Sequence, residues 1–159
     1  MGMIEPAKTV STGIEFSTAS VYDTWDEAVG LMISNQGETG VLTPEEFKPD
    51  RVRYEEAESL GLLRLHTMRH DGELVGYALF LIANHLHYKD TKFATVDVLY
   101  VSPLHRGINA VSFMQWQDEQ LKSDGVQVVF RQVSSKNDYS RTLERMGYAF
   151  CERSFIKRI

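Results

Sequence analysis

The chain has 159 residues, of which 43% are hydrophobic and 25% are charged, values typical of one globular domain. Its formal net charge of -5 at pH 7 argues against general nucleic-acid binding, because that function needs a basic face. The single cysteine, Cys151, has no partner for an internal disulfide, which fits a reducing compartment such as the cytoplasm.

No stretch of the chain predicts a membrane or secretory segment. The first ten residues, MGMIEPAKTV, lack the apolar core of a signal peptide, and Pro6 breaks a myristoylation pattern after Met1-Gly2. The longest apolar run, Leu74 to Ala83, is too short to cross a bilayer. We therefore expect one cytoplasmic domain over residues 1–159, following a loose lead-in from Met1 to Ser11.

The first third of the chain predicts a strand followed by helices. Gly13 to Thr18 alternates as a strand does, and Ser20 then occupies the N-cap position of a helix that should end at Gly37 and Gly40. The three- and four-residue spacing of apolar side chains predicts one buried helix face, formed by Tyr22, Trp25, Val29, Met32 and Ile33.

Two shorter helical segments should follow. Thr43 to Glu46 has the pattern of a capping box with proline at the first helical position, which predicts a helix start. Pro49 interrupts this segment, and Asp50 begins a second helix that continues to Leu60 and ends at Gly61.

The clearest local pattern is a hairpin. Asp71-Gly72, the dipeptide typical of a type I′ turn, joins the strand-like runs Leu62 to His70 and Glu73 to Ala83. The second run is apolar on both sides and therefore predicts a central strand covered on both faces. The polar segment 84–92 predicts a loop, which carries His85 and His87.

A strand, a break and a helix come next. Phe93 to Val101 predicts a half-buried strand, and a Ser-Pro-Leu-His break leads to Arg106-Gly107 and a helix with Gln117 as the polar exception on its buried face. The apolar residues expected on that face are Ala110, Phe113, Met114 and Leu121.

The remaining elements alternate again. Asp124-Gly125 should turn the chain into a strand from Val126 to Val133. A helix from about Asp138 to Met146 and a final strand from Tyr148 complete the chain. Strands and helices alternating around an antiparallel hairpin predict a mixed α/β fold.

The turn at Arg106-Gly107 predicts an anion site. The first N–H groups of a helix have no intrahelical partners, and they point at whatever lies before the helix. Arg106 adds a cation to these N–H groups. The expected ligand is a phosphorylated cofactor.

This order of motifs resembles the GNAT (GCN5-related N-acetyltransferase) superfamily, whose R/Q-x-x-G-x-G/A loop binds the pyrophosphate of acetyl-CoA. Arg106 and Gly107 match the loop, Asn109 stands where glycine is usual, and Ala110 or Val111 takes the last small position. The resemblance covers roughly Leu62 to the last residue and includes KNDYSRTLERMGY, similar to the family's penultimate helix. The phrase His85-Leu86-His87-Tyr88 is most like small bacteriophage-encoded acetyltransferases.

The resemblance implies a mainly antiparallel sheet flanked by helices, with a splayed parallel strand pair. It also implies cofactor binding by the backbone of the Leu99-Tyr100-Val101 segment and by Asn137, which is equally acceptable as a helix cap. In the turn, the implied cofactor-binding residues are Arg106, Gly107, Ile108, Asn109, Ala110 and Val111.

The catalytic candidates are Asp97 and Tyr139. The family often has a carboxylate on this strand, and a carboxylate in an apolar strand has a raised pKa that suits a general base; otherwise Asp97 is a solvent-facing residue. The family's tyrosine general acid corresponds to Leu143, and Tyr139 lies one turn earlier on the same face. Tyr139 is otherwise a core residue.

The acceptor candidates are Trp25, His85 and His87. An aromatic residue at helical spacing is more often part of a core, and the two histidines are acceptor ligands, an alternative base or ordinary loop residues. We expect no metal, because two histidines are too few ligands for a metal site.

These observations predict an acetyl-CoA-dependent N-acetyltransferase that uses direct transfer in a ternary complex. The amine acceptor is a small molecule, a modified nucleobase or a protein, and a homodimer is allowed. If the chain is phage-encoded, we expect it in the host cytoplasm. The alternative is a catalytically inactive binding or inhibitory protein with the same fold, since the loop and the tyrosine position depart from the family.

Overall fold

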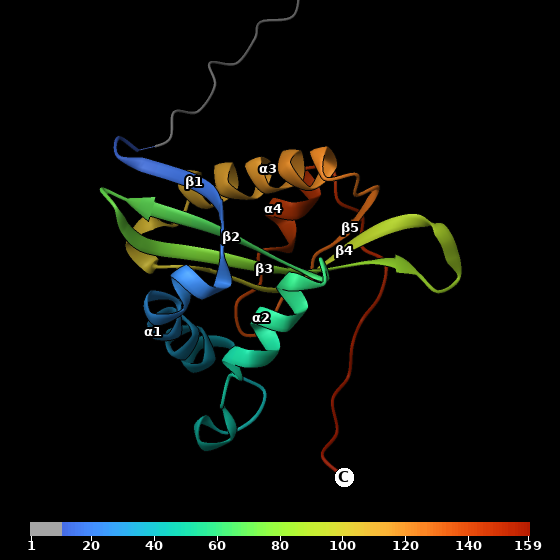
Figure 1. The fold of residues 1–159 in the computed structure, drawn as a ribbon, viewed down its shortest axis with the longest axis horizontal. Helices are drawn as coiled ribbons and strands as arrows, with labels where there is room; N and C mark the ends of the chain where they lie inside the picture. Colours follow the sequence, from blue (N-terminus) through green and yellow to red (C-terminus); the bar gives the residue numbers. More distant parts are fainter. Residues whose placement is uncertain (1–10) are drawn as a thin grey trace, which may run out of the picture.

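The computed structural model describes residues 11–159 as a five-stranded sheet with helices on both faces (Figure 1). The predictions for residues 1–10, namely most of the lead-in and the lack of a signal peptide and of a myristoylation pattern, lie outside the described residues. The strands follow chain order across the sheet: β1 (Ile14–Ala19), β2 (Leu63–His70), β3 (Glu73–His85), β4 (Tyr88–Val101) and β5 (Val128–Phe130). Only β4 and β5 are parallel, which confirms the mixed, mainly antiparallel α/β class.

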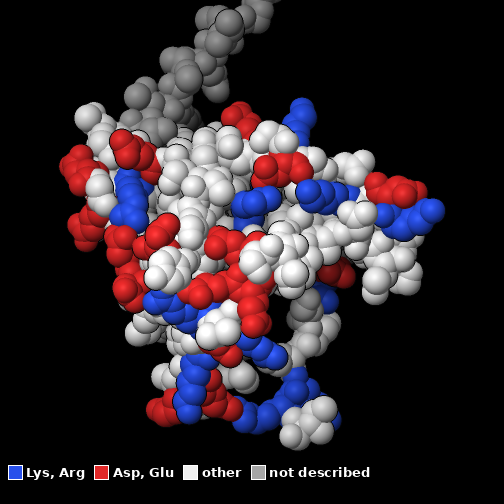
Figure 2. All heavy atoms as spheres, viewed as in Figure 1, with Lys and Arg blue, Asp and Glu red and all other residues white. Residues whose placement is uncertain are grey.

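The helices form a layer on each face of the sheet (Figure 1). One face carries α1 (Val21–Thr39) and α2 (Arg51–Ser59), and the opposite face carries α3 (Ile108–Ser123) and α4 (Ser140–Arg145). Two hydrophobic clusters fill the spaces between these layers and the sheet, because alternate strand residues face opposite sides. Figure 2 shows acidic and basic side chains interspersed on the face viewed.

The buried face of α1 differs from the expected one. Tyr22 and Ile33 are 67% and 60% exposed, whereas Val21 and Ala28 are buried beside Trp25. The predicted stripe was therefore wrong at these two positions, because several apolar residues on a helix compete for one face and packing against the sheet selects among them. The helix also continues through Gly37 and ends at Gly40.

The next segments largely follow their predicted turn and cap chemistry. Asp71 and Gly72 both have positive φ, 49° and 86°, which confirms the type I′ hairpin. Asp50 caps α2 by accepting a hydrogen bond from the Arg53 N–H. Both bonds of the capping box at Thr43 are present, but they support only a short 3-10 turn, η1 (Pro44–Glu46), rather than an α-helix.

The predicted histidine loop was wrong. The flanking strands continue to His85 and from Tyr88, so that only Leu86 and His87 form the tip. This end of the hairpin projects beyond the helices (Figure 1), where both strand faces meet solvent. Polar residues are therefore compatible with strand structure here.

The C-terminal elements are shorter than predicted. The buried face of α3 contains Phe113, Met114, Gln117 and Leu121, as expected, while β5 has three residues and α4 six. No strand forms over residues 148–159, so the predicted final strand was wrong. The Tyr148 hydroxyl donates to Asp118 Oδ1 at 2.7 Å, and the chain then leaves the sheet. Among residues 11–159, no helix is long and apolar enough to cross a membrane.

Candidate active site

One edge of β4 is left without a partner strand. β5 pairs with β4 only from Phe93 to Thr95, so the stretch from Val96 to Val101 lacks a neighbour on that side within the described residues. On the other side, the Ser102 N–H donates to Val75 O of β3. Because backbone groups alternate along an antiparallel pair, the N–H and C=O of Leu99 and Val101 point toward the open side. They are the two residues expected to contact the cofactor through their backbone.

A β-bulge lies at Asp97, where this open stretch begins. Val96 pairs with Phe80 and Val98 pairs with Leu79, so Asp97 is the extra, unpaired residue of β4. A bulge bends its strand and redirects a side chain. Here the bulge directs Asp97 toward the face of the sheet that carries α2.

The turn after β4 leaves backbone N–H groups exposed at the start of α3. It passes through the 3-10 turn η2 (Pro103–His105) to Gly107, which has φ 78° and precedes α3 without a side-chain cap. The Val111 N–H bonds to Gly107 O, which leaves the N–H groups of Ile108, Asn109 and Ala110 without intrahelical partners. We call the open stretch from Leu99 to Val101 and this turn, Arg106 to Ala110, the cofactor edge.

Arg106 is held by an ion pair that the sequence did not predict. Its Nη2 donates at 2.7 Å to both carboxylate oxygens of Glu38 on α1, and its Nε donates to Val101 O at 2.7 Å. The guanidinium also lies 5.7 Å from the centre of the Tyr100 ring. Glu38 therefore fixes the cation and offsets its charge.

The unusual residue Asn109 points into the core. Its side chain is buried, and Oδ1 accepts a hydrogen bond from the Ser11 N–H at 3.0 Å. This hydrogen bond satisfies the side-chain oxygen of Asn109, and the side chain does not fill the turn before α3. The Asn109 side chain therefore leaves the three free N–H groups available to a ligand.

A second feature is a small hollow on the α2 side of the sheet, of about 190 Å³. We call it the acceptor hollow, and its lining residues are Arg53, Tyr54, Leu63, Leu81 and Asp97. Asp97 retains contact with solvent, yet the surrounding protein removes part of the hydration of its carboxylate. This desolvation raises the pKa of Asp97 above its usual value.

Tyrosines surround Asp97 within this layer. Desolvation and the nearby Asp97 charge raise the pKa of Tyr54, and desolvation is also the main cause of the raised pKa of Tyr77. Trp25 is 9% exposed and packs edge-on against Tyr54, with ring centres 5.3 Å apart. Trp25 therefore supports the wall of the acceptor hollow from behind.

Tyr139 and Asn137 lie in the segment that follows β5. Tyr139 is the N-cap residue of α4 rather than a residue within it, and its hydroxyl donates to Gln132 O at 3.4 Å. Desolvation raises its pKa, although the nearby Arg131 acts in the opposite direction. Asn137 is exposed and bridges to Ser134, so it is not the helix cap.

The two histidines lie together, but far from Asp97. The His87 N–H donates to His85 Nδ1 at 3.1 Å, and the His85 ring packs 4.8 Å from that of Phe93. His85 lies five residues along β3 from Phe80, which pairs with Val96 beside Asp97. At about 3.3 Å per residue the separation is about 17 Å. The structure thus does not bring these histidines to the acceptor hollow.

A buried polar network under α3 was also missed by the sequence analysis. The Arg131 side chain is fully buried and donates to Asp118, Gln117 and Tyr148. Burial is the main cause of the raised pKa of Tyr148, about 12. This network fixes the chain after β5 against α3. A lone arginine in a strand-like sequence gives no local signal of such partners.

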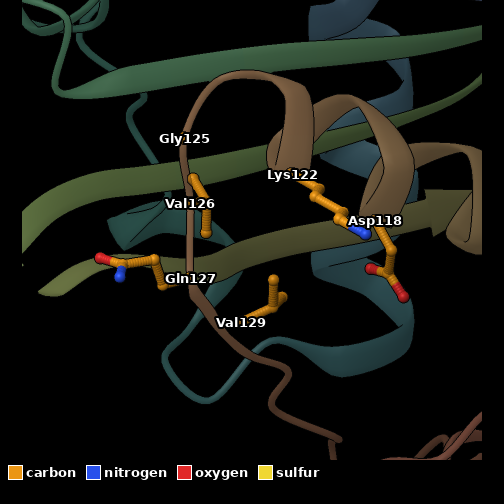
Figure 3. Close-up of a pocket in the computed structure, with 6 residues that line it drawn as sticks. All are labelled: Asp118, Lys122, Gly125, Val126, Gln127 and Val129. Carbon is orange, nitrogen blue, oxygen red and sulfur yellow. The ribbon is translucent and has the colours of Figure 1, made fainter.

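A larger hollow, about 530 Å³, is separate from these features (Figure 3). It lies between the last turns of α3 and the chain leading into β5, and it contains none of the predicted site residues. Its lining residues are Asp118, Lys122, Gly125, Val126, Gln127 and Val129. Within residues 11–159, no group of three or more His, Cys, Asp or Glu side chains is arranged to hold a metal.

Comparison with known proteins gives a family match. The model described as "Acetyltransferase (GNAT) family" matches residues 26–148, a range that contains α2, the β4 bulge and the turn at Gly107. A search of curated protein sequences finds no match.

Solved structures share the fold at low sequence identity. A ribosomal-protein-alanine N-acetyltransferase from Brucella melitensis is 19% identical, with a TM-score of 0.69 over 92% of this chain and 99% of that chain. Glucosamine-6-phosphate N-acetyltransferase from Arabidopsis thaliana is also 19% identical, with a TM-score of 0.66 over 91% and 97%. A predicted acetyltransferase with acetyl-CoA from Clostridium acetobutylicum is 12% identical, with a TM-score of 0.63 over 91% and 96%.

Proposed function

Because the chain belongs to the Acetyltransferase (GNAT) family, we propose that it moves an acetyl group from acetyl-CoA to a primary amine, using the cofactor edge and the acceptor hollow. The acetyl group passes directly between the two substrates in a ternary complex. The observation that carries this proposal is the open stretch of β4, which joins the Asp97 bulge to the Gly107 turn.

The cofactor edge fits the phosphorylated arm of coenzyme A. The free N–H groups of Ile108, Asn109 and Ala110 are donors for a diphosphate, and Gly107 provides the backbone conformation that exposes them. Arg106 adds a positive charge beside them, and Val111 continues the same first turn of helix. The outward N–H and C=O of Leu99 and the N–H of Val101, on either side of Tyr100, are available to an extended ligand, while Val101 O accepts from Arg106.

Asp97 is the proposed general base. Acetyl-CoA supplies an activated thioester when bound, and the acceptor amine must lose a proton as its nitrogen bonds to the carbonyl carbon. A carboxylate with a raised pKa accepts that proton, directly or through a water molecule, more readily than an ordinary aspartate does. The backbone N–H groups on the open side of β4 are suitable donors to the carbonyl oxygen.

Tyr139 is the proposed source of the proton for the departing thiolate, with water as the alternative. Its support is its place after β5, the strand that borders the open side of β4. The weak contact of its hydroxyl with Gln132 O, at 3.4 Å, leaves that group able to change partners. Asn137, two residues earlier, is a proposed contact for the cofactor arm.

In this proposal the acceptor binds in the acceptor hollow, and Trp25 contributes by packing against Tyr54, which lines it. His85 is about 17 Å from Asp97, estimated from the strand rise, and His87 follows it at the hairpin tip, so they can touch only a long acceptor. The neighbours named for ribosomal-protein alanine and for glucosamine-6-phosphate support an amine acceptor of either the protein or the small-molecule class.

Calorimetry tests the cofactor half of the proposal. Acetyl-CoA should bind in the micromolar range, and a thiol-detecting assay should record CoA release when a suitable amine is added. Absence of binding at millimolar acetyl-CoA would refute the proposal.

The alternative is a non-catalytic protein that retains the fold. Two observations favour it: Arg106 is already paired with Glu38, and the usual tyrosine position is occupied by the buried Leu143. This alternative predicts no CoA release with any amine, even where acetyl-CoA binds. Release with a single acceptor would exclude it.

The setting of this activity is part of the same proposal. The phrase from His85 to Tyr88 supports a bacteriophage source, with the host cytoplasm as the place of action. One domain over residues 1–159 carries both halves of the site, and a homodimer is compatible with them. Analytical ultracentrifugation of the purified chain reads the oligomeric state directly.

A further inference from the structure

The acceptor hollow contains one cation and one carboxylate. Arg53, on the first turn of α2, and Asp97, at the β4 bulge, line the same space of about 190 Å³. Pockets for drug-sized ligands have volumes of about 300–1,000 Å³. The acceptor hollow therefore suits a small head group rather than a large ligand.

Arg53 differs from most arginines of the described chain in having no acidic partner. No carboxylate of residues 11–159 lies within ion-pair distance of its guanidinium, whereas Arg51, on the same turn, contacts Asp26 and Glu55. The arginines that do form ion pairs are Arg51, Arg64, Arg69, Arg106, Arg131 and Arg158. The positive charge of Arg53 is thus available to a ligand.

The position of Arg53 does not favour the helix. A cation in the first turn of a helix meets the positive end of the helix dipole, which is mildly destabilising. Arg51 offsets this cost through its two carboxylate partners, and Arg53 has no such compensation among residues 11–159. A role in ligand binding would explain the residue, whereas a role in helix stability would not.

Asp97 is uncompensated in the same way. Among residues 11–159 its carboxylate accepts no side-chain hydrogen bond and forms no ion pair. Desolvation raises its pKa, and Arg53 forms no ion pair with it. Two opposite charges therefore share the hollow as separate binding points.

We infer that the acceptor is a small amine that also carries an anionic group, with the amine at Asp97 and the phosphate or carboxylate at Arg53. This inference rests on the proposed function, because it assigns the acceptor of that reaction. Tyr54 supplies a ring and a hydroxyl to the part of the acceptor between its two charges. Guanidinium groups bind carboxylate and phosphate with paired hydrogen bonds, so both anions are served by one residue.

Matched pairs of amines test the inference by titration calorimetry on protein saturated with CoA. The phosphate arm compares glucosamine 6-phosphate with glucosamine, and the carboxylate arm compares 4-aminobutyrate with butylamine. We expect at least one anion-bearing amine to bind about tenfold or more tightly than its counterpart without the anion. Equal binding within both pairs, tighter binding of the amines without the anion, or no binding by any of the four would overturn the inference.

Arg53→Gln should reduce this preference to about twofold or less, because it removes the guanidinium and keeps a polar side chain. Arg141→Gln, which removes an exposed arginine without an ion pair in the described residues from α4, is the matched control and should retain the preference. Arg53→Gln should also melt at the wild-type temperature or above, since it removes an unfavourable charge from the first turn of α2. Loss of preference together with a lower melting temperature would assign Arg53 a structural role instead.

Binding of acetyl-CoA, measured separately, distinguishes failure of this inference from failure of the proposed function. If acetyl-CoA binds and the amine pairs show no preference, this inference fails while the proposed function stands. If acetyl-CoA does not bind, the proposed function fails, and the amine pairs titrated without CoA still report on Arg53.

Discussion

The cofactor edge and the acceptor hollow are built in different ways. The cofactor edge presents backbone groups of β4 and α3, whose positions depend on one glycine and on the end of a strand pairing. The acceptor hollow presents side chains from α2, β2, β3 and β4, which meet only after the helices pack. Backbone sites tolerate most side-chain changes, whereas side-chain sites do not. We therefore expect specificity to vary in the acceptor hollow while cofactor binding depends mainly on backbone conformation.

Asp97→Asn should give the largest effect, because it removes the proposed base and leaves the cofactor edge intact. Loss of a positioned base lowers kcat/KM by about 10²- to 10⁴-fold. Acetyl-CoA affinity should stay within about twofold of wild type. Steady-state kinetics and calorimetry measure the two quantities, and a parallel loss of acetyl-CoA binding would argue against the division into two regions.

The pH dependence follows from the raised pKa of Asp97. The kcat/KM of the wild-type protein should rise as pH increases through the raised pKa of Asp97. The kcat/KM of Asp97→Asn should not show this rise. A folded-state pKa above the unfolded one favours the protonated form in the fold, so the contribution of Asp97 to stability is lost as pH rises. Asp97→Asn should thus melt at the wild-type temperature or higher at pH 7, and a clear decrease would contradict this assignment.

His66, which lies outside the cofactor edge and the acceptor hollow, should make the stability of the protein depend on pH. It is fully buried between Phe80 and Trp116, and burial lowers its pKa to about 4. A depressed pKa means that its stabilising contribution is present above the unfolded value of 6.5 and is lost as pH falls toward 4. Between pH 7.5 and pH 5 the free energy of unfolding should fall by roughly 2 kcal/mol from this group.

Urea unfolding at the two pH values measures this loss. His66→Leu should remove most of the difference, and His87→Gln, which changes an exposed histidine at the hairpin tip, should retain it. An unchanged pH dependence in His66→Leu would assign the effect to other groups. The measurement separates the loss of stability at low pH from the pH dependence of kcat/KM that is assigned to Asp97.

Gly107→Ala should weaken the cofactor edge. The φ of 78° at Gly107 costs a residue with a Cβ about 1–2 kcal/mol, although no atom lies within 4 Å of the added carbon. Relaxation of the turn would misalign the free N–H groups of α3, and acetyl-CoA affinity should fall about tenfold.

Gly30→Ala is the matched control for this change. Gly30 lies within α1, also with no atom within 4 Å of an added Cβ, and it is not among the residues with positive φ. Alanine there should stabilise the protein by about 0.5–1 kcal/mol without changing acetyl-CoA affinity. Similar acetyl-CoA affinities for the two variants would show that the Gly107 conformation is not needed for binding.

Glu38→Gln should give the smallest effect, in the opposite direction. Removing the carboxylate that pairs with Arg106 leaves more positive charge for a diphosphate, so acetyl-CoA affinity should increase by about threefold at low salt. The gain should shrink at high ionic strength, because both side chains are partly exposed. Glu27→Gln, on the same helix as Glu38, frees Arg69 of β2 and should have no such effect.

Much of the cofactor edge could be predicted from the sequence. A strand that ends before a short break, a glycine and a helix specifies free N–H groups through local geometry alone. The same holds for the type I′ turn at Asp71-Gly72 and for the cap at Asp50. Each of these features depends on dihedral preferences and on hydrogen bonds between residues that are close in the chain.

Other features depended on partners far along the chain. Arg106 pairs with Glu38 across 68 positions, and Arg53 shares a hollow with Asp97 from a different element. The Asp97 bulge appears only in the register of β4 against β3. The polar hairpin end was read as a loop because its composition resembles one, while the absence of helices above it permits solvated strands.

The sequence by itself therefore determined the order of the elements as far as α4, most turns and caps, and the free N–H groups before α3. Tertiary structure decided which face of α1 is buried, where β5 separates from β4, and which charges are paired. The physical reason is range: backbone dihedral preferences and capping act over about four residues. Ion pairs, desolvation and strand register arise only where packing brings distant segments together.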